Sequence, residues 1–397
     1  MAPQRPGRAT FLALLPLLLV AGGSVRLSGA EPARGELSAL ARLGDAIFHD
    51  TSLSSSGRMA CATCHDASRA FAGADDLAVP LGGPTLATPG LRNAPSLKYL
   101  AWNPAFSFDT EGTPVGGMDR DGRATGFADQ ARGPLLAPFE MGNLSADDVV
   151  AKMKRADYAG EFRHLFGDKA FDDGAQALGS ALLAVQQFER EDTATFAPFN
   201  SKYDAYLAGD AQLSEEEARG LRLFEDPQKG NCAACHPSRR ADDGTPPLFT
   251  DFTYDNIGVP RNPEIAANAD PKYYDLGLCG SLRTDLADRR DLCGLFKVPT
   301  LRNVALTAPY FHNGRFKTLR EAVEFYVRRD THPEEWYPVG ADGTVHKYDD
   351  LPPEFVHNVN TDEVPYDRHP GDLPALSPSE INAVVAFLQT LTDDYRK

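Results

Sequence analysis

Two short stretches of the 397-residue sequence carry the residue types best suited to chemistry. Each holds two cysteines separated by two residues and followed directly by a histidine: Cys61-Ala-Thr-Cys64-His65 and Cys232-Ala-Ala-Cys235-His236. A chain of this length and composition would contain roughly 0.002 copies of the pattern by chance. The two copies, called the first and second motif below, therefore indicate a shared chemical role.

The C-x-x-C-H pattern is the signature of covalent haem attachment, in which both thiols add to the vinyl groups and the histidine binds the iron. A zinc site would need further Cys or His ligands at finger-like spacing, and a redox dithiol has no need of the histidine in both copies. We therefore expect two covalently attached haem c groups, with His65 and His236 as iron ligands.

The group on the far side of each iron decides between an electron carrier and an enzyme, since catalysis needs an open position. No histidine lies between His65 and His164. The methionines near the first motif are Met59, Met118, Met141 and Met153. None is an obvious strong ligand, so we expect the first iron to be open.

Methionine from the second half cannot bind the second iron, because none follows Met153. Tyr326 ends a helical pattern over residues 318–326 and is one candidate, although it could also be a packed aromatic on a buried helix face. The other candidates are His312, His332, His346, His357 and His369. A phenolate ligand would stabilise ferric and higher states, whereas methionine raises the potential.

The elements around the motifs repeat. Residues 44–50 and 220–226 each place Gly and Phe one helical turn apart before a motif, and Ser214 with Glu217 forms a capping-box pattern. Amphipathic patterns near 178–188 and 381–391 close the two halves, the second introduced by Ser377-Pro378.

We therefore expect a mostly α fold of two cytochrome c-like haem domains, residues 31–200 and 201–397, related by an internal repeat. Long stretches rich in Gly, Pro and Asp should form irregular loops around the haem edges or at an interface: 66–92, 102–122 and 329–375.

The first thirty residues predict a cleavable secretory signal, with early arginines, an apolar run from Phe11 to Val20 and small residues before Ala30. The alternative is an uncleaved anchor, but the run is shorter than the roughly 18 residues of a spanning helix. We expect a periplasmic protein with no stable membrane insertion. Losing three arginines takes the net charge from -16 to -19, which disfavours nucleic acid and favours basic or dipolar partners.

Cys279 and Cys293 lie fourteen residues apart, and neither is followed by histidine. A disulfide between them is the simplest interpretation for an exported protein.

Glu140 follows Pro138-Phe139 in an apolar setting. A carboxylate there could move a peroxide proton from one oxygen to the other, and burial would raise its pKa towards a useful range. Most glutamates in such a setting merely cap a helix or form an ion pair.

From about residue 36 to 392 the chain resembles the bacterial di-haem cytochrome c peroxidase and MauG superfamily. The strongest stretch is residues 296–315, Phe-Lys-Val-Pro-Thr-Leu-Arg-Asn-Val-Ala-Leu-Thr-Ala-Pro-Tyr-Phe-His-Asn-Gly-Arg, supported by residues 92–95, 121–123 and 133–140. The resemblance implies a peroxide-reactive haem on the first motif, with a distal pocket lined by Gln130, Pro134 and Glu140. It also implies a six-coordinate electron-transfer haem on the second motif, with Tyr326 where peroxidases carry Met and MauG-type enzymes carry Tyr.

The resemblance further implies a calcium ion between the haems, held by the Asn93 side chain and the carbonyls of Thr307 and Pro309, oxygen ligands suited to that cation. Two departures stand out. No distal histidine precedes Arg92, and Arg120 replaces the tryptophan usual between the haems. Trp102 could act as a relay instead, or simply be a packed aromatic.

We therefore expect an exported di-haem oxidoreductase that activates hydrogen peroxide at the first haem and takes electrons through the second. The electrons would come from a protein donor such as a small cytochrome or a cupredoxin. The alternative is a MauG-type enzyme that oxidises a Tyr or Trp side chain of a partner protein. A third interpretation is a carrier with both irons six-coordinate.

Overall fold

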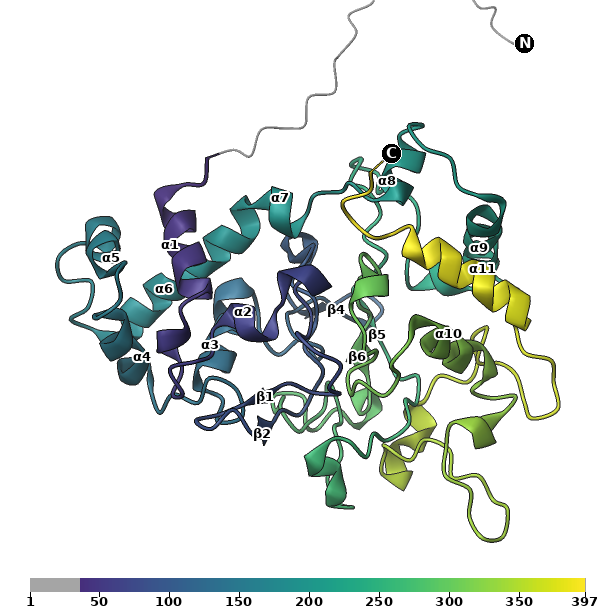
Figure 1. Ribbon diagram of the computed structural model, residues 1–397. Helices are drawn as coiled ribbons and strands as arrows, with labels where there is room; N and C mark the ends of the chain where they lie inside the picture. Colours follow the sequence, from purple (N-terminus) through teal and green to yellow (C-terminus); the bar gives the residue numbers. More distant parts are fainter. Residues whose placement is uncertain (1–35, 397) are drawn as a thin grey trace, which may run out of the picture. The chain divides into compact units, whose positions relative to one another are not determined.

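Two pairs of packed helices dominate the computed structural model, which describes residues 36–396. In the first pair α1 (Ala39–Phe48) crosses α6 (Gly174–Glu191), and in the second α9 (Glu215–Glu225) lies against α11 (Pro378–Gln389) (Figure 1). The predicted closing helices are confirmed as α6 and α11. The predicted signal at residues 1–30 lies outside the described residues.

Glycine allows each pair to pack closely. A Cβ atom on Gly44 would overlap the carbonyl oxygen of Ala184, and one on Gly220 would overlap the carbonyl oxygen of Ala383. No other residue lets two helix backbones approach this far, because every other side chain begins with a Cβ atom. The glycine that precedes each motif is therefore the point at which the two helices of each pair meet.

The remaining helices and strands are short. The helices are α2 (Cys61–Cys64), α3 (Phe127–Leu136), α4 (Ala146–Met153), α5 (Ala159–Phe166), α7 (Thr193–Phe196), α8 (Lys202–Leu207) and α10 (Leu319–Arg328). Three antiparallel two-residue strand pairs accompany them: β1 (Leu81–Gly82) with β2 (Thr88–Pro89), β3 (Ser107–Phe108) with β4 (Pro114–Val115), and β5 (Tyr254–Asp255) with β6 (Phe296–Lys297). The fold is mainly helical, as the sequence predicted.

Side-chain caps fix where the helices begin. Ser214 accepts a hydrogen bond from the Glu217 backbone, and the Glu217 carboxylate accepts one from the Ser214 backbone at 2.7 Å, which confirms the predicted capping box. Ser377 caps α11 in the same way, with Pro378 at the first helical position. Thr318 caps α10, the helix that carries Tyr326. These local bonds satisfy backbone N–H groups that have no partner inside the helix.

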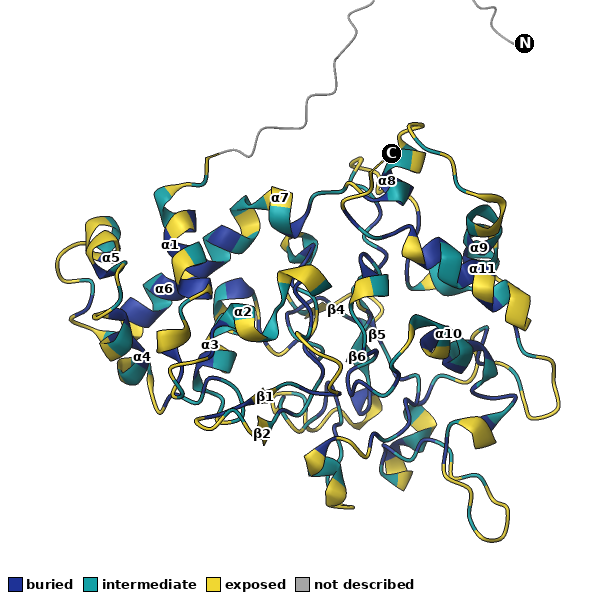
Figure 2. Ribbon diagram, viewed as in Figure 1, coloured by how far each residue is buried: buried dark blue, intermediate teal, exposed yellow. Residues whose placement is uncertain are grey.

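Two large hydrophobic cores lie within the described residues. The first gathers residues between 43 and 196, including Phe48, Leu178 and Phe188, and the second gathers residues between 203 and 391, including Phe224 and Phe387. Figure 2 shows buried residues on the faces with which α1 and α6 meet. Residues from Leu37 onward nevertheless belong to one compact unit, so the boundary near residue 200 stays a prediction.

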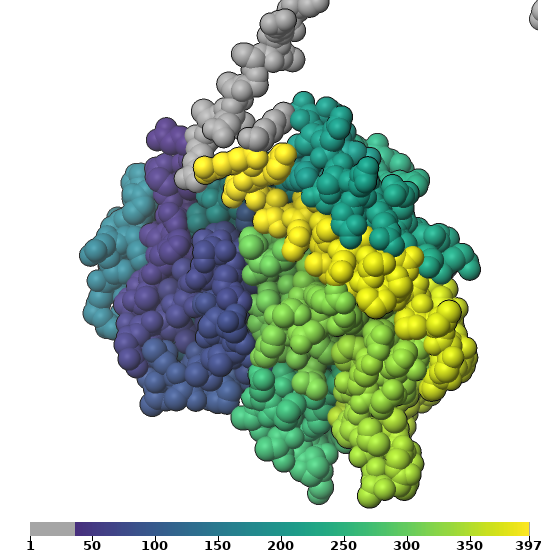
Figure 3. All heavy atoms as spheres, turned by 45° about the vertical axis from the view of Figure 1, so that its right-hand side comes forward, coloured from purple at the N-terminus to yellow at the C-terminus, as the bar shows by residue number. Residues whose placement is uncertain are grey.

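Contacts join the segments that carry the two cores. The Lys98 ammonium lies 2.9 Å from the Asp393 carboxylate, and the Tyr254 hydroxyl donates to the carbonyl of Gly116 at 2.5 Å. Figure 3 shows the blue residues of the earlier segments directly beside the green residues of the later ones.

The predicted disulfide between Cys279 and Cys293 is confirmed. Within residues 36–396, no helix combines the length and the apolar character needed to cross a bilayer.

Candidate functional site

The first four residues of the first motif form helix α2, from Cys61 to Cys64, and His65 follows as the C-cap. The Nδ1 atom of His65 lies 2.8 Å from the carbonyl oxygen of Phe71. A carbonyl oxygen can only accept, so Nδ1 carries the proton and Nε2 keeps its lone pair for a metal. Burial lowers the pKa of His65, which keeps the imidazole neutral.

The second motif repeats this arrangement on a short 3-10 turn, Cys232–Ala234. The Nδ1 atom of His236 lies 2.7 Å from the carbonyl oxygen of Phe249, and burial lowers the pKa of His236. Each histidine is thus held by a backbone carbonyl with its Nε2 atom available as a ligand.

A cavity of about 320 Å³ adjoins the second motif. Its lining includes Cys232, Cys235 and His236, with Tyr326 and Gln130 among the other residues. Covalent haem needs two thiols and an imidazole facing one hollow space, and a second donor there completes the coordination of the iron. The donors around this cavity fit haem c.

Tyr326 lies on α10 and lines the cavity. Burial raises the pKa of its phenol, and Asp255, Cys232 and Cys235 raise that pKa further, which indicates that the hydroxyl is near both attachment cysteines. Among the described residues no side chain or backbone group forms a hydrogen bond with this hydroxyl. Tyr326 is therefore well placed as a second donor to the iron.

His312 also lines the cavity, but its ring stacks on Phe296 with 3.7 Å between the ring centroids. Burial lowers its pKa to about 3. The other sequence candidates are not among the residues that line this cavity: His332, His346, His357 and His369. The structure thus favours Tyr326 over the five histidines.

Glu140 lies near the first motif. Burial raises its pKa to about 7, with Arg123 lowering it and Asp119 raising it further. In turn Glu140 raises the pKa of the Cys64 thiol, after the larger effect of burial. The carboxyl group can therefore exchange a proton at neutral pH beside the first attachment pair.

The backbone of Glu140 is held by the strand β1 region. The N–H of Gly83 donates to the Glu140 carbonyl at 2.7 Å, and a Cβ atom on Gly82 would overlap the carbonyl oxygen of Phe139. The stretch 66–92, expected only as an irregular loop, thus positions the candidate proton-transfer group.

Gln130 and Pro134 lie on α3, the helix that leads to Glu140. The Gln130 side-chain amide donates to Asp119 at 3.2 Å, and the Pro134 carbonyl accepts from the Met141 N–H at 3.0 Å. The three expected pocket residues therefore come from one helix and the turn after it. A smaller cavity of about 20 Å³ lies beside Cys61, and Met141 is part of its wall.

Sequence reasoning missed Glu189, which lines the large cavity. Burial raises its pKa to about 8, and its carboxyl group has no hydrogen bond or ion pair among the described residues. Comparison of the two helix pairs points to this position. Gly44 meets Phe188 and Gly220 meets Phe387, so the next residues, Glu189 and Leu388, occupy equivalent places on the two closing helices.

Asn93, predicted to bind calcium, contacts Arg120. The Arg120 guanidinium donates from Nη2 to the Asn93 side-chain oxygen at 2.6 Å and from Nε to the Asn93 carbonyl at 3.1 Å. Thr307 and Pro309, the other expected ligands, line the large cavity together with Asn93.

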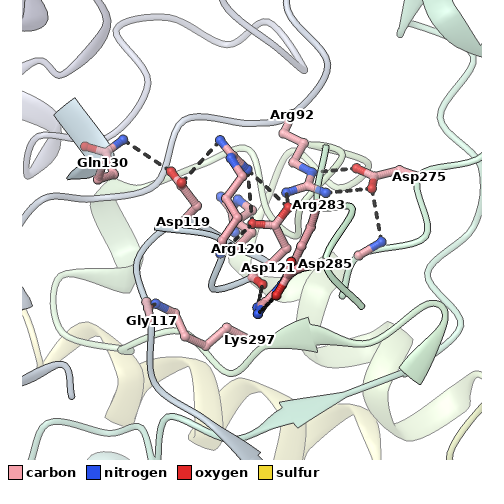
Figure 4. Close-up of polar contacts among 12 residues, drawn as sticks. Arg92, Gly117, Asp119, Arg120, Asp121, Gln130, Asp275, Arg283, Asp285 and Lys297 are labelled. Carbon is pink, nitrogen blue, oxygen red and sulfur yellow. Dashed lines mark hydrogen bonds and ion pairs between the residues drawn. The ribbon is translucent and has the colours of Figure 1, made fainter. Parts of the chain in front are cut away.

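Charged side chains surround Arg120 (Figure 4). Arg92 pairs with Asp275 at 2.6 Å and with Asp121 at 2.7 Å. Burial lowers the pKa of Lys297 to about 8, and its ammonium donates to the carbonyl of Gly117. In this cluster Arg92 forms ion pairs with carboxylates, whereas Arg120 and Lys297 bond to uncharged oxygen atoms.

Trp102, the suggested relay, packs edge-on against Phe199 with ring centroids 5.0 Å apart. This contact fits the packed-aromatic interpretation, and a role as a relay stays a prediction.

Comparison with known proteins gives concordant results. A family model described as di-haem cytochrome c peroxidase matches residues 38–212. The methylamine utilization protein MauG of Paracoccus denitrificans is 36% identical over 400 residues, which cover 97% of this chain and 95% of that protein. Cytochrome c551 peroxidase of Nitrosomonas europaea is 32% identical over 72% of each chain.

The diheme peroxidase BthA of Burkholderia thailandensis has a similar crystal structure, with a TM-score of 0.82 and 39% identity over 91% of this chain and 88% of that chain. Together with the donors around the two motifs, these matches place the chain in the di-haem cytochrome c peroxidase and MauG family, as an oxidoreductase of the peroxidase superfamily with two haem cofactors.

Proposed function

We propose that this enzyme reduces hydrogen peroxide at a haem attached to the first motif and receives electrons through a haem attached to the second. The bound haem groups would supply the redox chemistry, in which peroxide, two electrons and two protons give two molecules of water. The observation that carries the proposal is the Glu140 carboxyl, a titratable group with a near-neutral pKa beside Cys64.

Glu140 would act as the general acid-base. Peroxide is neutral near pH 7, so a base must take its first proton, and a group with a pKa near the working pH can also return it to the other oxygen. Gln130, held by Asp119, would orient the peroxide. Pro134 has no N–H group and offers no competing backbone donor.

Tyr326 and His236, which line the same cavity, would together hold the iron of the second haem. A phenolate is a hard anionic donor that stabilises ferric and higher states of iron. The position of Tyr326 in the cavity at the second motif favours the second candidate function. That function is MauG-type oxidation of a Tyr or Trp side chain on a partner protein. In the peroxidase version the partner is a small cytochrome or cupredoxin that donates electrons.

We also propose that the chain consists of two cytochrome c-like domains, residues 31–200 and 201–397, related by an internal repeat. The glycine crossings at Gly44 and Gly220 and the two separate hydrophobic cores support this division. Export to the periplasm rests on the pattern of residues 1–30 and fits the disulfide, which persists in oxidising compartments.

Rapid mixing of the haem-loaded enzyme with hydrogen peroxide tests the function, together with electron paramagnetic resonance of the resting state. We expect a high-spin ferric signal from an open first iron and a fast spectral change with peroxide. A protein that is inert to peroxide and shows only low-spin signals would instead be an electron carrier. Turnover with a reduced small cytochrome supports the peroxidase, whereas mass spectrometry that finds an oxidised partner Tyr or Trp supports the MauG-type alternative.

A further inference from the structure

Arg120 contacts the residue that the family resemblance assigns to calcium. We infer that the guanidinium group of Arg120 takes the place of a calcium ion at the junction of the two haem sites, so that this enzyme needs no metal there. The inference goes beyond the proposed function, because it concerns what holds the junction together rather than the reaction.

Both oxygens of Asn93 are already used. Its side-chain oxygen accepts from Arg120 Nη2 at 2.6 Å and its carbonyl oxygen accepts from Arg120 Nε at 3.1 Å. A calcium ion would bind through the same two oxygens, where the positively charged guanidinium already lies, so calcium and Arg120 compete for them.

Backbone hydrogen bonds already join the chain segments that carry the expected calcium ligands. The Arg120 carbonyl accepts from the Lys297 N–H at 2.8 Å, and the Asn93 N–H donates to the His312 carbonyl at 2.8 Å. Residues 297 and 312 flank Thr307 and Pro309, the other expected calcium ligands. These backbone bonds link Asn93 and Arg120 to this segment without a separate ion, while the Arg120 guanidinium occupies the oxygens of Asn93.

The surrounding charges disfavour a further dication. The nearby carboxylates are occupied, since Asp275 and Asp121 both pair with Arg92. Calcium prefers six to eight oxygen ligands, commonly with carboxylates among them. A calcium ion at this place would lie beside cations, and the nearby carboxylates are already paired with Arg92.

Metal analysis and thermal unfolding of the haem-loaded enzyme test the inference. After dialysis we expect far less than one calcium per chain, and the same unfolding midpoint with a chelator as with millimolar calcium. Arg120→Gln removes the guanidinium and frees Asn93, so its midpoint should fall and calcium should raise it again. Arg120→Lys keeps a cation and should stay insensitive to calcium.

Arg123→Gln is the matched control. Arg123 is a cation of the same cluster, but its bonds go to Asp119 at 3.2 Å and to Asp121 at 3.1 Å. This variant should show no response to calcium, so a calcium response in it would mean that any lost charge creates metal binding.

Three results would overturn the inference: about one calcium per wild-type chain whose removal lowers the midpoint, an Arg120→Gln variant as stable as wild type, or an Arg120→Gln variant that calcium does not stabilise. None of these readouts uses peroxide. The inference and the proposed function can therefore fail separately.

Discussion

Replacing Glu140 with Gln keeps the size of the side chain and removes its ability to accept a proton. With a pKa of about 7, about half of the wild-type molecules carry the carboxylate at pH 7, but only about one in a hundred does at pH 5. We therefore expect the wild-type rate constant for peroxide activation to fall about 50-fold between these pH values. Glu140→Gln should be slower by about 10² to 10⁴ at pH 7 and show no such pH dependence.

Two charged neighbours of Glu140 predict the direction in which the pH profile should move when they are replaced. Asp119 raises the pKa of Glu140 and Arg123 lowers it. Asp119→Asn should therefore shift the pH profile towards acid, and Arg123→Gln should shift it towards alkali. Glu161→Gln, on the exposed surface of α5, changes the same functional group and should leave the profile in place.

The assay is stopped-flow measurement of the second-order rate constant with peroxide from pH 5 to 9, after each variant is shown to carry both haem groups. Wild-type rates in Glu140→Gln would remove Glu140 from the mechanism. Profiles that do not move in opposite directions in the two neighbour variants would show that another group sets the pH dependence.

The remaining predictions concern the second haem and the scaffold. Tyr326→Met should raise the reduction potential of the second haem, because a neutral ligand replaces an anionic one; an unchanged potential in protein-film voltammetry would show that another group binds that iron. Gly220→Ala should lower the free energy of unfolding by about 1–3 kcal/mol or more, because the added Cβ overlaps the carbonyl of Ala383; an unaltered denaturant midpoint would mean that the helices separate at little cost. Removing the disulfide by Cys279→Ala with Cys293→Ala should cost about 3 kcal/mol, the expectation for a closed loop of about 15 residues, and equal stability of the variant and the oxidised wild type would contradict it.

Features set by neighbouring residues in the chain were predictable from the sequence. The closing helices were expected near 178–188 and 381–391, and α6 and α11 cover 174–191 and 378–389. The Ser214 capping box and the helix that contains Tyr326 also follow from short-range patterns, because the hydrogen-bonded capping groups lie within one helical turn. The disulfide followed from cysteine count and compartment.

Helix α3 is not evident from the sequence, because Gly133 and Pro134 disfavour a helix interior. The contact between Arg120 and Asn93 joins residues 27 positions apart, and no local pattern specifies it. From the sequence, Arg120 was noted only because it stands where the family usually has a tryptophan, and Asn93 was expected to bind calcium. Such contacts depend on how distant loops pack together, and patterns among neighbouring residues do not determine that packing.

The two glycine crossings make the same close contacts, which lets residues on the two closing helices be compared position by position. At one aligned position the first half has Glu189, a carboxyl without a partner among the described residues, where the second half has Leu388. In the first half, the segment after the Asp121-Gly-Arg123 turn leads to Glu140. In the second half, the segment after the Asn313-Gly-Arg315 turn leads to Tyr326. Proton-exchanging carboxyls on one side and a phenol on the other suit peroxide activation and electron storage, respectively. In the function we propose, these side chains thus help to give the two haem sites different chemistry.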